Sequence, residues 1–124
     1  MKKDIEKRED IVLLVNSFYD KVKNNKILGY IFTDVAKVDW EAHLPKMYSF
    51  WSSLLLGEQS YTGNPMMKHI ALSKLTKLTE TEFSEWLLLF NQNVDDLFEG
   101  EKASEAKIRA ANIARLMLVK IEKS

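Results

Sequence analysis

Cysteine is absent from the 124-residue chain. Its absence excludes disulfide bonds, thiolate zinc sites and cysteine nucleophiles, and it fits a protein of the reducing cytoplasm, where we expect this one. An excess of charge of either sign is also missing, because 18 Lys and Arg balance 18 Asp and Glu. A net charge of zero without any long basic run argues against nucleic acid as a partner.

Long apolar runs and turn-forming residues are scarce as well. No apolar run approaches the roughly 20 residues that a membrane helix needs, and the opening MKKDIEKRED offers no apolar core for a signal peptide. Four glycines and two prolines are fewer than an all-β protein with many tight turns uses. We therefore predict one all-α domain, residues 1–124, without membrane contact, and we expect residues 1–8 to form a flexible extension.

Apolar residues at helical spacing predict four long helices. The first covers residues 9–24, and its apolar face carries Ile11, Leu14, Val15, Phe18 and Val22. An apolar piece at 27–32 then predicts a tight connection.

The second helix is predicted from Asp39, a plausible N-cap, to Leu56, with Gly57 as its stop. Pro45 predicts a bend or an irregular first turn, because proline removes a helix hydrogen bond. The face expected to point inward carries His43, Met47, Phe50, Trp51 and Leu54.

The second half of the chain begins with a loop at 57–65 that is dense in helix breakers. Residues 66–72 can form about two helical turns, and 73–80 predicts another connection. A capping box of Thr79 and Glu82 starts the third helix, which Gly100 ends. The fourth covers 103–123, and its inner stripe is Ala106, Ala110, Ile113, Ala114, Met117 and Ile121.

The familiar catalytic motifs are missing from the sequence. It has no glycine-rich phosphate loop, no G-x-S-x-G elbow, no H-E-x-x-H pair and no calcium-loop spacing. Paired carboxylates such as Asp95 and Asp96 fall on polar faces, where charged residues are normally solvated. The candidates for chemistry are therefore the two histidines, His43 and His69.

Each histidine taken alone has a simple structural explanation. His43 on an apolar face is most simply a core histidine with hydrogen bonds to backbone or water, and His69 an exposed histidine near a helix end. Together they face a region rich in aromatic residues and poor in carboxylates, which suits a flat apolar cofactor. Zinc would need further His or Cys ligands that the chain lacks, whereas haem iron needs one histidine.

The two histidine segments also carry a family resemblance. The run HLPKMYSFW at 43–51 and the run YTGNPMMKH at 61–69 follow Phe18-Tyr19 and Ile31-Phe32 and precede Trp86. This order of motifs, over about residues 11–114, resembles the group III truncated haemoglobins. The resemblance implies a two-over-two helical sandwich around haem b, with a very short helix bearing the proximal histidine.

The resemblance also implies residue roles. His69 matches the proximal iron ligand, and Tyr19, His43 and Trp86 match the distal residues around a bound gas. The residues that would line the haem are Phe32, Met47, Phe50 and Trp51. Beside these, Tyr61 and Lys68 are candidates for contact with the haem propionates, and the alternative is that both are exposed surface residues.

The leading functional hypothesis is a monomeric globin that binds O₂ or NO, for tight binding or redox chemistry more than for bulk transport. Polar hydrogens from Tyr19 and Trp86 favour this, because they stabilise a bound ligand that carries partial negative charge. One alternative is a haem-free helical interaction module, in which both histidines are incidental. Another is a haem-dependent peroxidase or NO-detoxifying enzyme served by an external reductase.

Overall fold

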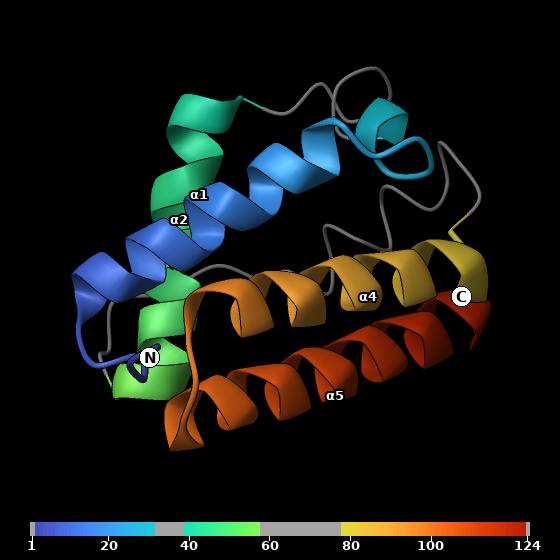
Figure 1. Cartoon of the computed structure of the whole chain (residues 1–124). Coiled ribbons are helices and arrows are strands. Elements are labelled where there is room, and N and C mark those ends of the chain that lie inside the picture. Colours follow the sequence, from blue (N-terminus) through green and yellow to red (C-terminus); the bar gives the residue numbers. More distant parts are fainter. Residues whose placement is uncertain (1, 32–38, 58–77, 124) are drawn as a thin grey trace.

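The computed structural model describes residues 2–31, 39–57 and 78–123, and all regular secondary structure in these ranges is helical. Four long helices occur there, as predicted: α1 (Arg8–Lys23), α2 (Trp40–Leu56), α4 (Glu80–Leu97) and α5 (Glu101–Lys123). In Figure 1, α1 crosses α2, while α4 and α5 run antiparallel side by side. Helix α1 contacts both α2 and α4, so it joins the two pairs into a two-over-two arrangement.

The start of α1 is held by Asp10, a buried carboxylate in the first turn of the helix. Its Oδ2 accepts hydrogen bonds from the backbone N–H groups of Glu6 (2.9 Å) and Lys7 (3.2 Å). Its Oδ1 forms an ion pair with Lys3 Nζ at 2.9 Å. These contacts satisfy N–H groups ahead of the helix, where no intrahelical acceptor exists.

Helix α2 begins after Asp39 and ends at Gly57 in the left-handed conformation (φ 75°), as predicted for both ends. The buried face of α2 differs from the predicted one at its C-terminal end, however: Ser52 and Leu55 are buried, whereas Leu54 is only half-buried. The run Leu54-Leu55-Leu56 fits two helical registers equally well. The register with Leu55 inside is hard to recognise from the sequence because it also buries a polar residue, Ser52. The helix continues through Pro45, whose side chain is exposed.

The turn between α4 and α5 brings the N-terminal segment into the fold. The predicted capping box starts α4, since Thr79 N–H donates to Glu82 Oε1 at 2.6 Å. Helix α4 ends at Leu97, three residues before Gly100. The first turn of α5 is then capped by Asp4, which accepts hydrogen bonds from the N–H groups of Lys102 and Ala103 at 2.9 and 2.8 Å.

Gly100 is required by this arrangement for two reasons. Its φ of 139° is one that L side chains rarely adopt. A Cβ added there would also lie 2.6 Å from Asp4 Cγ. Together with Ile5, which is 1% exposed, these contacts attach residues 4–5 of the expected extension to the core and to α5.

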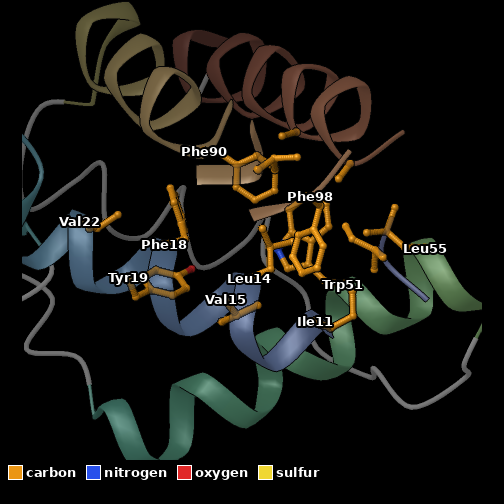
Figure 2. Close-up of a cluster of buried hydrophobic side chains, with 14 of the residues drawn as sticks. Ile11, Leu14, Val15, Phe18, Tyr19, Val22, Trp51, Leu55, Phe90 and Phe98 are labelled. Atoms are coloured by element: carbon orange, nitrogen blue, oxygen red, sulfur yellow. The ribbon is translucent and has the colours of Figure 1, made fainter. Parts of the chain in front are cut away.

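The core lies where α1, α2 and α4 meet (Figure 2). Phe90 of α4 stacks on Trp51 of α2 with centroids 4.8 Å apart, and Phe18 of α1 meets Phe90 edge-on at 5.2 Å. The predicted alanine stripe of α5 is confirmed by the burial of Ala106, Ala110 and Ala114. Small side chains on this face allow α4 and α5 to pack closely.

Asn93 is the most deeply buried polar residue on α4, at 0% exposure. Its Nδ2 donates to the backbone carbonyl of Leu14 at 2.9 Å, and its Oδ1 accepts from Lys21 Nζ at 2.8 Å. Asn93 therefore ties α4 to two successive turns of α1.

Candidate functional site

Tyr19 is the buried hydroxyl of the candidate site. It lies one residue beyond Phe18 on α1, is 7% exposed, and meets the Phe18 ring at 5.1 Å (Figure 2). Burial raises the pKa of the Tyr19 phenol further above its ordinary value of 10.0. At neutral pH the side chain is consequently a protonated hydroxyl that can donate a hydrogen bond.

His43 of α2 contacts Tyr19 directly. The two ring centroids lie 5.3 Å apart at an interplanar angle of 81°, an edge-to-face arrangement. The imidazole is half-buried. Tyr19 and His43 are two of the three residues for which the sequence predicts a distal role. They are more than 20 positions apart along the chain, and the crossing of α1 and α2 brings them together.

Trp40 completes an aromatic cluster with Tyr19 and His43. Its ring lies 5.3 Å from Tyr19 and 5.7 Å from His43, and Lys23 Nζ lies 4.4 Å above its centroid. The sequence analysis missed Trp40. A signal was present, because Trp40 precedes His43 by three residues, a spacing that places both on one side of a helix.

Trp86, the third predicted distal residue, lies half-buried on α4. Its ring meets Phe18 edge-on at 5.6 Å and stacks on Phe90, also at 5.6 Å. Phe18 contacts both Trp86 and Tyr19, so it links the α4 indole to the aromatic cluster.

The remaining predicted site residues divide into two groups. Met47 and Phe50 are half-buried on α2, and Trp51 lies in the core against Phe90. Four others lie outside the described residues, so their roles stay predictions: Phe32, Tyr61, Lys68 and His69.

Metal ligands and membrane-spanning helices can be assessed in the part of the chain that the structure describes. Within it, no group of three or more His, Cys, Asp or Glu is placed to hold a metal ion. Nor is any helix in these ranges long and apolar enough to cross a membrane.

Two helix pairs joined through α1, with a buried phenol on α1, an imidazole on α2 and an indole on α4, define a helical protein of the truncated globin type. Residues 4–119 match the family model for bacterial-like globins. The chain belongs to this family and, within it, to the group III truncated haemoglobins, which confirms the resemblance seen in the sequence.

Two relatives illustrate the match. The protein described as "Group 3 truncated hemoglobin ctb" from Campylobacter jejuni is 35% identical over 118 residues, which cover 92% of this chain and 90% of the relative. A crystal structure of group III truncated haemoglobin from Campylobacter jejuni superposes with a TM-score of 0.84 at 32% identity, covering 98% of this chain and 95% of that one. The likeness therefore extends over the whole domain.

Proposed function

We propose that this protein binds haem b and uses it to hold a diatomic gas, O₂ or NO. The observation that carries the proposal is the contact of Tyr19 with His43, at 5.3 Å between ring centroids, inside a globin fold. This contact places a phenol and an imidazole from two crossing helices side by side.

The described residues fit the distal side of such a group. Haem needs a wall that is mainly apolar, with a few hydrogen-bond donors near the open iron position. Half-buried Met47 and Phe50 on α2 supply apolar surface, while Tyr19, His43 and Trp86 carry an O–H and ring N–H groups. In the proposal His69 would hold the haem iron.

Haem, when bound, would supply an iron that can bind a diatomic gas. The chain's own residues then decide how firmly that gas is held. The protonated Tyr19 hydroxyl and the Trp86 indole N–H donate hydrogen bonds to a ligand that carries partial negative charge, and the apolar wall strengthens these bonds by excluding water. His43, at the start of α2, acts as a gate for the entering gas.

This set of donors favours retention of the gas or its redox conversion over rapid release. Two donors that each slow ligand escape oppose bulk transport, which requires fast dissociation. A redox role as a peroxidase or an NO-detoxifying enzyme would need electrons, and we propose an external reductase as their source.

The experiment that tests the proposal is absorption spectroscopy of the purified chain after haem reconstitution. We expect an intense Soret band, a pyridine haemochrome of the b type, and a shifted band for the ferrous–CO form. The two histidines provide a matched pair of variants: His69→Ala should lose haem or bind it far more weakly, whereas His43→Leu should retain it.

The absence of a Soret band after reconstitution would instead favour the haem-free interaction module. Retention by His69→Ala of the same five-coordinate ferrous spectrum would refute His69 as the iron ligand. Far-ultraviolet circular dichroism of both variants shows whether the helices have been preserved.

A further inference from the structure

Four side chains form one connected cluster between α1 and α2. Tyr19 and Lys23 lie one turn apart on α1, and Trp40 and His43 lie one turn apart on α2. Trp40 contacts the other three: Tyr19 at 5.3 Å, His43 at 5.7 Å, and Lys23 Nζ at 4.4 Å from the ring centroid. It is therefore the central member of the cluster.

We propose that Trp40 is a positioning residue that holds the imidazole of His43 edge-on against Tyr19. Trp40 and Tyr19 contact His43 at interplanar angles of 84° and 81°, so two rings restrain one imidazole. Edge-to-face contacts of this kind stabilise one relative orientation of two rings. Lys23 in turn fixes the indole through a cation–π contact.

The start of α2 gives these ring contacts an importance that they would not have in mid-helix. The N-cap residue Asp39 makes no side-chain capping hydrogen bond. Pro45, two residues beyond His43, has no N–H to donate to the preceding turn. His43 N–H still donates to the Asp39 carbonyl at 2.8 Å. The turn around it nevertheless lacks a side-chain cap and the Pro45 donor, so side-chain packing contributes more to the position of the imidazole than it would in a regular helix.

The inference has two parts, of which only the second rests on the proposed function. The first is structural: without the Trp40 ring, His43 separates from Tyr19 more often. The second is that His43, acting as the gate, then opens the pocket more often and lets a gas associate faster.

Nuclear magnetic resonance tests the first part, and the chain suits it because His43 and His69 are its only histidines. Histidine-labelled full-length protein, in the cofactor-free and diamagnetic ferrous–CO forms, should give two ring spin systems, and His43→Leu identifies that of His43. We expect Overhauser cross-peaks from the His43 ring to the rings of Tyr19 and Trp40.

The variant that removes the Trp40 ring while keeping apolar bulk is Trp40→Leu. Its His43–Tyr19 cross-peaks should weaken as the released state of His43 gains roughly two- to tenfold in population, the factor for one edge-to-face contact. Trp40→Phe, which keeps a ring, should restore them. Cross-peaks of wild-type intensity in Trp40→Leu would overturn the proposal.

Tyr48→Leu is the matched control, because Tyr48 is another aromatic residue of α2 that contacts α1. Its hydroxyl donates to Asn16 Oδ1 at 2.5 Å. This variant weakens the α1–α2 contact elsewhere and should leave the His43–Tyr19 cross-peaks unchanged. If it weakens them as much as Trp40→Leu does, general loosening of the interface explains the effect and the positioning role is wrong.

Flash photolysis of the haem-loaded ferrous–CO protein tests the second part. Trp40→Leu should raise the CO association rate roughly two- to tenfold, and the same substitution in a His43→Leu background should have no further effect. An equal acceleration in both backgrounds would show that Trp40 does not act through His43.

The two tests separate this inference from the proposed function. A protein that takes up no haem refutes the proposed function, while the cross-peaks of the cofactor-free form still decide the role of Trp40. A haem-loaded protein with unchanged cross-peaks in Trp40→Leu refutes only the role of Trp40.

Discussion

The cap that Asp4 places on α5 makes a quantitative prediction about stability. The Asp4 carboxylate accepts the N–H groups of Lys102 and Ala103, which a helix cannot satisfy from within. Gly100, just ahead of the helix, has no side chain with which to do this itself. In Asp4→Ala these donors lose their acceptor, and the positive end of the helix dipole loses a negative charge.

Loss of an N-cap acceptor typically costs about 1 kcal/mol, and loss of a charge beside the helix terminus adds roughly 0.3–1 kcal/mol. We therefore expect Asp4→Ala to lower the free energy of unfolding by about 1–2 kcal/mol at neutral pH. Asp4→Asn keeps one acceptor oxygen without the charge, so its free energy of unfolding should lie between those of wild type and Asp4→Ala. Urea denaturation followed by far-ultraviolet circular dichroism measures this as a lower midpoint with an unchanged slope.

The pH dependence gives an independent check. Burial acts to raise the pKa of Asp4, but the backbone hydrogen bonds from Lys102, Ala103 and Ile5, together with the Lys102 charge, outweigh it and lower the pKa below 3.8. A lowered folded-state pKa means that this stabilisation is present above pH 3.8 and is lost as the pH falls through the folded-state value. The stability difference between wild type and Asp4→Ala should accordingly shrink in acid.

Glu6→Ala is the control for this prediction, because Glu6 is an exposed carboxylate of the same segment. Exposed substitutions of this kind usually change stability by less than about 0.5 kcal/mol. If Asp4→Ala destabilises no more than Glu6→Ala does, or by the same amount in acid as at neutral pH, the capping argument is wrong.

Two further predictions concern the gas pocket. Tyr19→Phe or Trp86→Phe should raise the O₂ dissociation rate roughly ten- to hundredfold in stopped-flow measurements, because a hydrogen bond to a charged acceptor contributes about 1.5–3 kcal/mol. An unchanged rate in both variants and in their double variant would show that these residues do not stabilise the ligand. The gas-free ferrous protein should be mainly five-coordinate, with His43→Leu changing association rates. A six-coordinate, low-spin ferrous spectrum that disappears in His43→Leu would instead identify His43 as an iron ligand.

Helices with a strong local signal could be predicted from the sequence. The face of α1 from Ile11 to Val22 repeats at helical spacing, and the capping box of Thr79 and Glu82 involves only neighbouring residues. The register of α2 was harder, because Leu54 and Leu55 are equally apolar and only packing distinguishes them. Local patterns predict which side of a helix is apolar, but not which residues on that side the neighbouring helices bury.

Contacts between distant parts of the chain could not be predicted in this way. Asp4 caps a helix 98 residues further along the chain, and its sequence neighbours carry no trace of that partner. Trp40 is an intermediate case: its spacing from His43 is visible in the sequence, but its contact with Tyr19 depends on where α1 crosses α2. Tyr19, His43 and Trp86 were singled out as a set through the family resemblance, since their separations along the chain do not by themselves predict a common site.

Asn93 links the stability of the fold to the geometry of the candidate site, which leads to a last prediction. Asn93 holds α1 through the Leu14 carbonyl and Lys21, and Tyr19 lies between these two positions. Asn93→Leu nearly preserves side-chain volume but removes the acceptor of the half-buried Lys21 ammonium, so we expect a loss of about 1–3 kcal/mol in urea denaturation.

Lys21→Met distinguishes a hydrogen-bonding role of Asn93 from a packing role. If the cost of Asn93→Leu comes from leaving a charge without its acceptor, adding Lys21→Met removes that charge and should recover much of the lost stability. Simple addition of the two single costs would show instead that Asn93 does not act through Lys21. The hydrogen-bonding role also predicts that Asn93→Leu weakens the His43–Tyr19 cross-peaks. Adding Lys21→Met should not restore them, because both the single and the double variant lack the hydrogen bond from Asn93 to α1 beside Tyr19.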